Sequence, residues 1–192
     1  MKLRQSLLVL GFTTWGLIPT IFADYEEGVN AAFDGDYDTA FREFTVAAEA
    51  GLDMAQYNLA ILYYMGQGVE MDYQLAYKWT SAAAEQGHVA AAFNLGSLYS
   101  QGQGIEEDQT EAIEWYEYAA KSGHADAAYL LATIYRDGHT AESDPVQAHA
   151  WASMAIINEH QEGLELRRSI ERRMNSEELS QARRLFARWQ IE

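Results

Sequence analysis

A segment of 36 residues is repeated three times in tandem in the middle of this chain, beginning at Ala55, Ala91 and Ala127. A fixed period of this length is typical of solenoids, in which each supersecondary unit buries its apolar side only against its neighbours. The repeat therefore predicts a stacked array of similar units. The positions in register are Leu59, Leu95 and Leu131; Tyr63, Tyr99 and Tyr135; Gly66, Gly102 and Gly138; Asp72, Asp108 and Asp144; Trp79, Trp115 and Trp151.

Each copy has the pattern of two helices. In the first copy Leu59, Leu62 and Tyr63 recur at the spacing of one helix face. Gly66 and Gly68 follow, and Gly102 and Gly104 follow in the next copy, where glycine adopts the left-handed conformation that ends a helix. Asp72 then occupies the position of an N-cap for a second helix.

The second helix of each copy is expected to bury a stripe of alanines together with its tryptophan. In the first copy this stripe is Ala76, Trp79 and Ala83. Small alanines allow neighbouring helices to approach, and the tryptophan fills the remaining space. By the same register Trp115 and Trp151 are expected to be core residues.

The repeats divide the chain into consecutive segments. Residues 24–51 form a degenerate first repeat, 52–87 and 88–123 two regular repeats, and 124–163 a third repeat with an irregular end, where a longer second helix is expected. Residues 164–192 are expected to form a helical cap, because Asn175 and Glu178 have the spacing of a capping box. An all-α, right-handed solenoid closed by a C-terminal helix is the predicted fold.

Residues 1–23 have the layout of a secretory signal peptide, with Lys2 and Arg4 before an apolar stretch and a small Ala23 before Asp24. The apolar stretch is shorter than the ~20 residues that a membrane-spanning helix needs. We therefore expect cleavage after Ala23, a periplasmic or secreted location, and no transmembrane span in the mature chain. The oligomeric state is not predictable from the sequence.

The charge balance opposes nucleic-acid binding. The chain has 29 acidic and 13 basic residues, a formal net charge of -16, and such a surface repels a phosphate backbone. Seven arginines are nevertheless concentrated in residues 164–192. Two interpretations are open: they pair with acids of the preceding repeat and clamp the cap, or they form a docking patch for an acidic partner or an anionic membrane.

No constellation of residues indicates catalysis, a metal or a cofactor. The acids Asp34, Asp36 and Asp38 resemble the start of a calcium loop, but the glycine and glutamate expected at its sixth and twelfth positions are replaced by Thr39 and Thr45. The equivalent His88 and His124 lie one repeat apart, too far to share a metal. Serine nucleophile motifs and cysteines are missing from the sequence.

The clearest copy contains Ala91, Leu95, Gly96, Tyr99, Gly102, Gly104, Ile105, Asp108, Ala112, Trp115, Ala119, Ala120 and Gly123. With this pattern the chain resembles the Sel-one-like repeat family, which is related to the tetratricopeptide repeats. The resemblance covers residues 25–157 and implies a non-enzymatic scaffold or adaptor that binds proteins, here in assembly or regulation of a bacterial cell-envelope complex. An alternative is a cell-wall-active hydrolase or a β-lactam-binding protein.

Positions that differ between copies are free to determine specificity. On the first helices Tyr64 and Arg136 are residue types that often dominate binding energy at interfaces. We expect Tyr64, Asn58, Asn94 and Arg136 to contribute to a concave groove for a protein segment. For the two asparagines, a purely structural role in bonding neighbouring backbone is an equal alternative.

Overall fold

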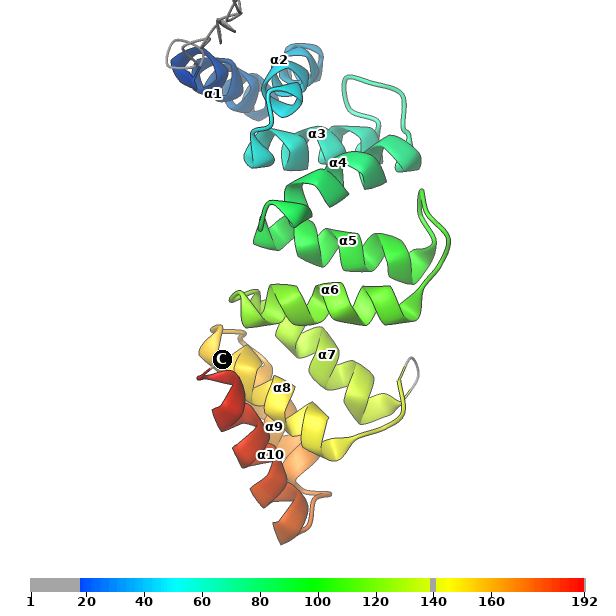
Figure 1. Cartoon of the computed structure of the whole chain (residues 1–192), viewed down its shortest axis with the longest axis vertical. Coiled ribbons are helices and arrows are strands. Elements are labelled where there is room, and N and C mark those ends of the chain that lie inside the picture. The colour runs from blue at the N-terminus through cyan, green and yellow to red at the C-terminus, as the bar shows by residue number, and fades with distance from the viewer. Residues whose placement is uncertain (1–17, 139–140, 192) are drawn as a thin grey trace, which may run out of the picture.

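The computed structural model describes residues 18–138 and 141–191, and over these residues it contains helices and no strands. Helices α1 to α8 stack in chain order as helix–turn–helix pairs, and at the far end of the array α9 and α10 both pack on α8 (Figure 1). The predicted all-α solenoid is confirmed. The helices are α1 (Ile18–Asp34), α2 (Tyr37–Glu49), α3 (Asp53–Met65), α4 (Tyr73–Glu85), α5 (Val89–Gln101), α6 (Gln109–Lys121), α7 (Ala125–Asp137), α8 (Pro145–Ile157), α9 (Gly163–Glu171) and α10 (Ser176–Trp189).

Local sequence explains where the repeat helices begin and end. Gly66 and Gly102 end α3 and α5 with φ angles of 66° and 63°, in the left-handed region that glycine enters without steric cost. Asp72 and Asp108 cap α4 and α6, each accepting hydrogen bonds from two backbone N–H groups through Oδ1. Asp144 caps α8 in the same way, ahead of Pro145.

In the first two loops a second glycine packs against the preceding repeat, whereas the third copy has Thr140 at this position of the sequence. Gly68 and Gly104 have φ angles of 67° and 77°, and each lies against the backbone at the start of the preceding second helix. A Cβ atom at Gly104 would overlap the carbonyl oxygen of Tyr73, the first residue of α4. The loop of one repeat therefore packs on the backbone of the repeat before it.

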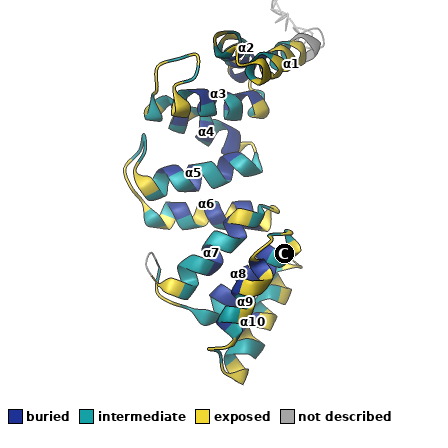
Figure 2. Ribbon diagram, turned by 180° about the vertical axis from the view of Figure 1, so that it is seen from behind, coloured by how far each residue is buried: buried dark blue, intermediate teal, exposed yellow. Residues whose placement is uncertain are grey.

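The buried side chains lie on the faces that neighbouring helices turn toward one another (Figure 2). They form two apolar clusters. The N-terminal cluster consists of Ala40, Phe44, Ala47, Ala48, Ala55, Leu59 and Leu62. The C-terminal cluster begins at Ala83 and Ala84 in α4 and continues through α5 to α9, with Leu95, Tyr116, Leu131 and Trp151 as large members.

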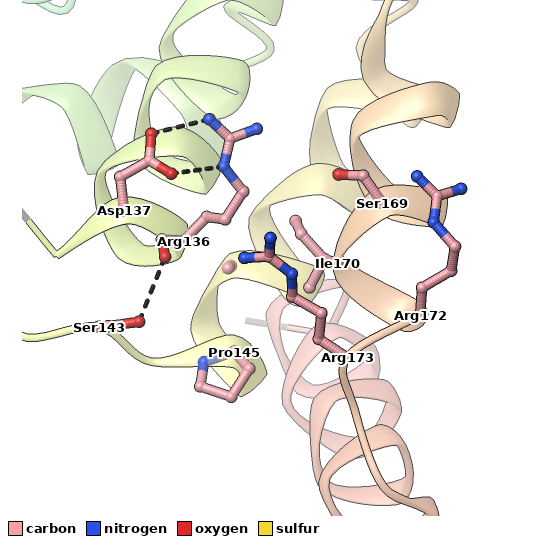
Figure 3. A pocket seen from close by; sticks show the side chains of 9 residues that line it. Arg136, Asp137, Ser143, Pro145, Ser169, Ile170, Arg172 and Arg173 are labelled. Carbon is pink, nitrogen blue, oxygen red and sulfur yellow. Dashed lines mark hydrogen bonds and ion pairs between the residues drawn. The ribbon is translucent and has the colours of Figure 1, made fainter.

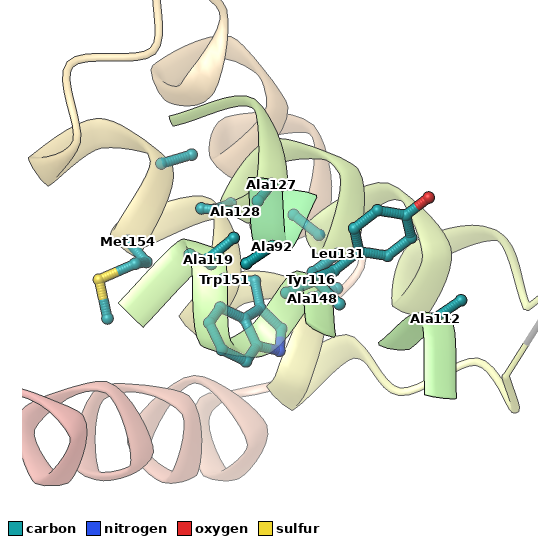
Figure 4. Close-up of a cluster of buried hydrophobic side chains, with 14 of the residues drawn as sticks. Ala92, Ala112, Tyr116, Ala119, Ala127, Ala128, Leu131, Ala148, Trp151 and Met154 are labelled. Carbon is teal, nitrogen blue, oxygen red and sulfur yellow. The ribbon is translucent and has the colours of Figure 1, made fainter. Parts of the chain in front are cut away.

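The expected stripe of buried tryptophans is correct only for Trp151. Trp79 and Trp115 are partly buried, and the next residue of each helix, Thr80 or Tyr116, is buried instead. Each tryptophan lies at the edge of the buried stripe, so its burial depends on what covers that edge. Trp151 is 0% exposed and lies within the buried cluster (Figure 4). Helix α10 provides its cover, and the Trp189 ring lies 4.1 Å from the Trp151 ring between centroids.

The end of the third repeat differs from the prediction. Helix α8 has 13 residues, like α4 and α6, and does not run longer. Glu159 takes the place of the closing glycine and adopts a φ angle of 66°. The short helix α9 follows after residues 158–162, and the sequence contains no sign of its start, because it has no side-chain cap. The predicted capping box of α10 is confirmed at Asn175 and Glu178.

Apolar packing, and not arginine ion pairs, attaches the cap. In the described part of the chain the arginines of residues 164–192 form ion pairs only with Glu171 and Glu177, which belong to the same segment. The clamp interpretation is therefore wrong. Leu166 and Ile170 are buried against the third repeat, and partly buried Phe186 and Trp189 pack beside them.

One polar contact between cap and repeat is sensitive to pH. His149 Nε2 lies 2.9 Å from Glu171 Oε1, and burial lowers the pKa of His149 below its ordinary value of 6.5 although Glu171 opposes the shift. The unfolded chain thus binds this proton more readily than the folded chain. The contribution of neutral His149 to the free energy of unfolding is therefore fully present above pH 6.5, and it is lost as the pH falls toward the lowered pKa.

We expect the free energy of unfolding to decline between pH 6.5 and pH 5, and His149→Gln to make this decline shallower. The difference between the two chains is limited to the titration of one proton, about 1.4 kcal/mol per pH unit. Urea unfolding at several pH values measures it. Equal slopes for both chains would show that His149 does not couple folding to pH.

At the other end, the expected signal peptide lies mostly outside the described residues. Helix α1 begins at Ile18 and continues past the expected cleavage position between Ala23 and Asp24. In α1, Ile21 and Tyr25 pack against the N-terminal cluster. Within the described residues, no helix is both long and apolar enough to cross a membrane.

Candidate functional site

A groove of about 420 Å³ lies between the first helices of two neighbouring repeats, α3 and α5. Its walls are formed by residues that these helices place on facing sides, with one residue from α4 and one from the loop after α5. No lining residue carries a charge, although 22% of the chain is charged. The lining residues are Tyr57, Ala60, Ile61, Tyr64, Met65, Thr80, Asn94, Ser97, Leu98, Gln101 and Gln103.

Helix geometry accounts for one wall. Ala60 and Ile61 lie three and four residues after Tyr57, and Tyr64 lies four and three residues after them, so all four share one face of α3. Tyr64 is 37% exposed and its ring meets that of Tyr73 edge-on at 5.3 Å between centroids. This contact holds an amphipathic aromatic ring at the mouth of the groove.

The opposite wall supplies amide groups. Asn94 and Gln101 lie on α5, and within the described residues neither side chain forms a hydrogen bond. The Ser97 hydroxyl is already engaged, because it donates to the Phe93 carbonyl and lies 3.2 Å from the Tyr116 hydroxyl that donates to it. Among the described residues, the side-chain amides of Asn94 and Gln101 and the hydroxyls of Tyr57 and Tyr64 are thus free to bond a peptide backbone or an uncharged polar side chain.

The four residues expected to share one groove do not do so. Tyr64 and Asn94 line it together. Asn58 instead lies where α3 meets α1, the first helix of the preceding repeat, in a different cavity. There its Nδ2 donates to the Tyr25 hydroxyl of α1 at 3.2 Å. Since Asn58 and Asn94 are one repeat apart, each faces the first helix of its own preceding unit, and the two cannot meet.

Arg136 lies two repeats beyond Tyr64, beside the cap. Its guanidinium group donates two hydrogen bonds of 2.7 Å to the carboxylate of the neighbouring Asp137. The pocket that it lines is formed by α7, α8 and α9 and is separate from the groove. Arg136 and Tyr64 thus line separate cavities, because equivalent positions two units apart are displaced along the solenoid.

Two histidines have a structural role that sequence reasoning missed. His88 and His124 are the N-caps of α5 and α7, and each Nδ1 accepts a hydrogen bond from the backbone N–H three residues later at 3.2 Å. Their rings stack on Tyr57 and Phe93 of the preceding first helices, with centroids 4.5 and 4.4 Å apart. The sequence feature that indicates this capping role is the position of each histidine directly before the first helix of its repeat.

The acidic turn at the start of the array also has a local role. Asp36 caps α2 by accepting a hydrogen bond from the Thr39 backbone N–H at 3.2 Å. Hydrogen bonding to Thr39 lowers the pKa of the Asp36 carboxyl group. Among the described residues, no three His, Asp or Glu side chains are grouped as ligands of a metal ion. The lining of the groove contains no histidine, acid or lysine that could transfer a proton at neutral pH.

Comparisons with known proteins place this geometry in a family. A crystal structure of a Sel1 repeat protein from Oxalobacter formigenes superposes with a TM-score of 0.68 and 29% identity, over 72% of this chain and 57% of that one. The crystal structure of c5321, a protective antigen of uropathogenic Escherichia coli strains displaying an SLR fold, gives a TM-score of 0.50 and 28% identity, over 88% of this chain and 45% of that one.

This chain thus spans about half the length of those two proteins. No curated protein matches it significantly. The family model for the Sel1 repeat matches three consecutive segments, residues 53–88, 89–124 and 125–160, which together make up more than half of the chain. On this match the chain belongs to the Sel1 repeat family.

Proposed function

We propose that this protein is a non-enzymatic adaptor that holds a segment of a partner protein in the groove between α3 and α5. The observation that carries the proposal is the uncharged groove on a chain with a net charge of -16. Sel1 repeat proteins generally mediate interactions between proteins, which supports the same role. An exposed tyrosine beside unpaired amides offers both buried area and backbone recognition.

We further propose that the adaptor acts in the cell envelope, in assembly or regulation of a complex. The support for this location is the signal-peptide pattern of residues 1–23. A hydrolase or a β-lactam-binding protein finds less support, because the groove's serine, Ser97, has no base beside it and donates its proton to the Phe93 carbonyl.

A photocrosslinking residue placed at Gln101 tests the groove directly. Gln101 is exposed and lines the groove, whereas Glu114 is exposed on α6 and does not. In cells that produce the protein, we expect the probe at Gln101 to capture one dominant protein segment, identified by mass spectrometry, and the probe at Glu114 not to capture it. Equal capture at both positions would place the partner elsewhere.

With the captured segment as a labelled peptide, Tyr64→Ala is expected to weaken binding about tenfold or more, because an exposed aromatic residue in a groove is a typical interface hot spot. Tyr118→Ala is the matched control. Tyr64 and Tyr118 are 37% and 42% exposed, and each makes one edge-on aromatic contact, but Tyr118 lies outside the groove. Fluorescence anisotropy measures both affinities, and equal losses would contradict the assignment.

A further inference from the structure

A second pocket, of about 570 Å³, lies where α7 and α8 meet the cap (Figure 3). Three arginines and one aspartate line it, so its lining has a net charge of +2 in a chain whose net charge is -16. Pro145 provides partly exposed apolar surface in the pocket, whereas Ala148 and Ile170 are 0% and 3% exposed. The pocket thus combines basic groups with a small apolar surface.

Two of the three guanidinium groups are available to a ligand. Arg136 is held by Asp137 through two hydrogen bonds of 2.7 Å. Arg172 and Arg173 follow the end of α9, both are exposed, and within the described residues neither side chain forms a hydrogen bond or an ion pair. In Figure 3 Arg173 extends toward Arg136, while Arg172 lies beside Ser169.

The other polar groups of the pocket are engaged within the protein. The Ser143 hydroxyl donates to the Arg136 carbonyl at 3.2 Å, and the Ser169 hydroxyl donates to the Leu166 carbonyl at 2.7 Å. Among the described side chains of the pocket, the hydrogen-bond donors left without a partner are therefore guanidinium N–H groups, chiefly those of Arg172 and Arg173. Such a set of donors recognises an oxyanion, and the planar guanidinium fork matches a carboxylate in particular.

We propose that this pocket binds an acidic segment of a protein partner, with Arg172 and Arg173 donating to its carboxylates and a neighbouring apolar side chain resting on Pro145. The inference rests on the proposed adaptor function and assigns the chemistry of a second docking point. A peptide fits better than a free oxyanion, because guanidinium groups beside a partly exposed proline match carboxylates together with an adjacent side chain, whereas a small anion would contact the charges alone. A concave pocket also suits a peptide better than a flat membrane surface.

The probe is the fluorescein-labelled peptide GDLELDLG, and its control is GNLQLNLG, in which amides replace the carboxylates. We expect the acidic peptide to bind the full-length chain with a dissociation constant below 1 mM and the amide peptide at least tenfold more weakly. Higher salt should weaken only the acidic peptide, since ionic strength screens exposed charges. Absence of binding up to 2 mM, or equal binding of both peptides, overturns the proposal.

The double substitution Arg172→Gln and Arg173→Gln is expected to weaken acidic-peptide binding at least tenfold. The matched control is Arg168→Gln with Arg188→Gln, which removes the same charge from exposed arginines of the cap that do not line the pocket. We expect the control to change affinity less than twofold. Equal losses would show attraction to the whole cap and would overturn the pocket.

Three further measurements separate the remaining possibilities. Inorganic phosphate or phosphatidylglycerol vesicles that bind through Arg172 and Arg173, without acidic-peptide binding, would overturn the peptide as occupant. Circular dichroism melting of both double variants checks that each is folded, and equal melting temperatures are expected. The Tyr64→Ala chain should bind the acidic peptide normally, so failure of the groove and failure of this pocket can be distinguished.

Discussion

Gly104→Ala is expected to destabilise the solenoid by about 3 kcal/mol or more. Gly104 has a φ angle of 77°, which costs an L-residue roughly 1–2 kcal/mol. In addition, the new Cβ would overlap the backbone carbonyl of Tyr73, which cannot rotate away as a flexible side chain could. To remove this overlap the loop must move away from α4. Forcing extra atoms into packed structure typically costs a further 1–3 kcal/mol or so.

Gly35→Ala separates the two contributions. Gly35 has a φ angle of 81°, close to that of Gly104, but no atom lies within 4 Å of the position of its Cβ. This control should lose only the conformational contribution, roughly 1–2 kcal/mol. Urea unfolding followed by circular dichroism gives both values, and equal losses would mean that the contact between loop and preceding repeat is not rigid.

Trp151→Ala is expected to cost about 3–5 kcal/mol, the usual range for removing a fully buried aromatic residue. The Trp151 side chain is 0% exposed and lies between the third repeat and α10, where its ring contacts that of Trp189 at 4.1 Å between centroids. Truncation leaves a cavity at the joint that attaches the cap. The C-terminal helices should therefore lose order before the rest of the array.

Trp115→Ala is the matched comparison, since Trp115 occupies the same position one repeat earlier. It is only partly buried, and it contacts Tyr118 edge-on at 6.1 Å between centroids. We expect its loss to cost less than half as much as the loss of Trp151, as measured by urea unfolding. A cost equal to that of Trp151 would show that α10 does not determine the burial of this position.

The features that could be predicted from the sequence are those that depend on neighbouring residues. The helix pairs follow from Leu59 and its equivalents, and the helix ends follow from Gly66, Asp72 and the box of Asn175 with Glu178. In each case the residues that cause the structure lie within a few positions of one another. Periodicity then extends one unit to the whole array.

The features that could not be predicted depend on contacts between adjacent repeats, or between the last repeat and the cap. The register treats Trp115 and Trp151 as equivalent, but only Trp151 is covered by α10. Likewise Asn58 and Asn94 share a position in the repeat, yet one is bonded to Tyr25 and the other lines the groove. A repeat pattern defines the place of a residue within its unit, whereas its partners depend on the adjacent unit.

The division of the core into two clusters has a mechanical consequence for the groove. Helix α3 is anchored by Leu59 and Leu62 in the N-terminal cluster, and α5 is anchored by Leu95 in the C-terminal cluster. The two walls thus belong to different parts of the core, but they are not independent, because Tyr57 of α3 packs against the C-terminal cluster and its ring stacks on that of His88 at the start of α5. A segment bound in the groove would contact both parts of the core, and the side chains that bridge them oppose a change in the width of the opening.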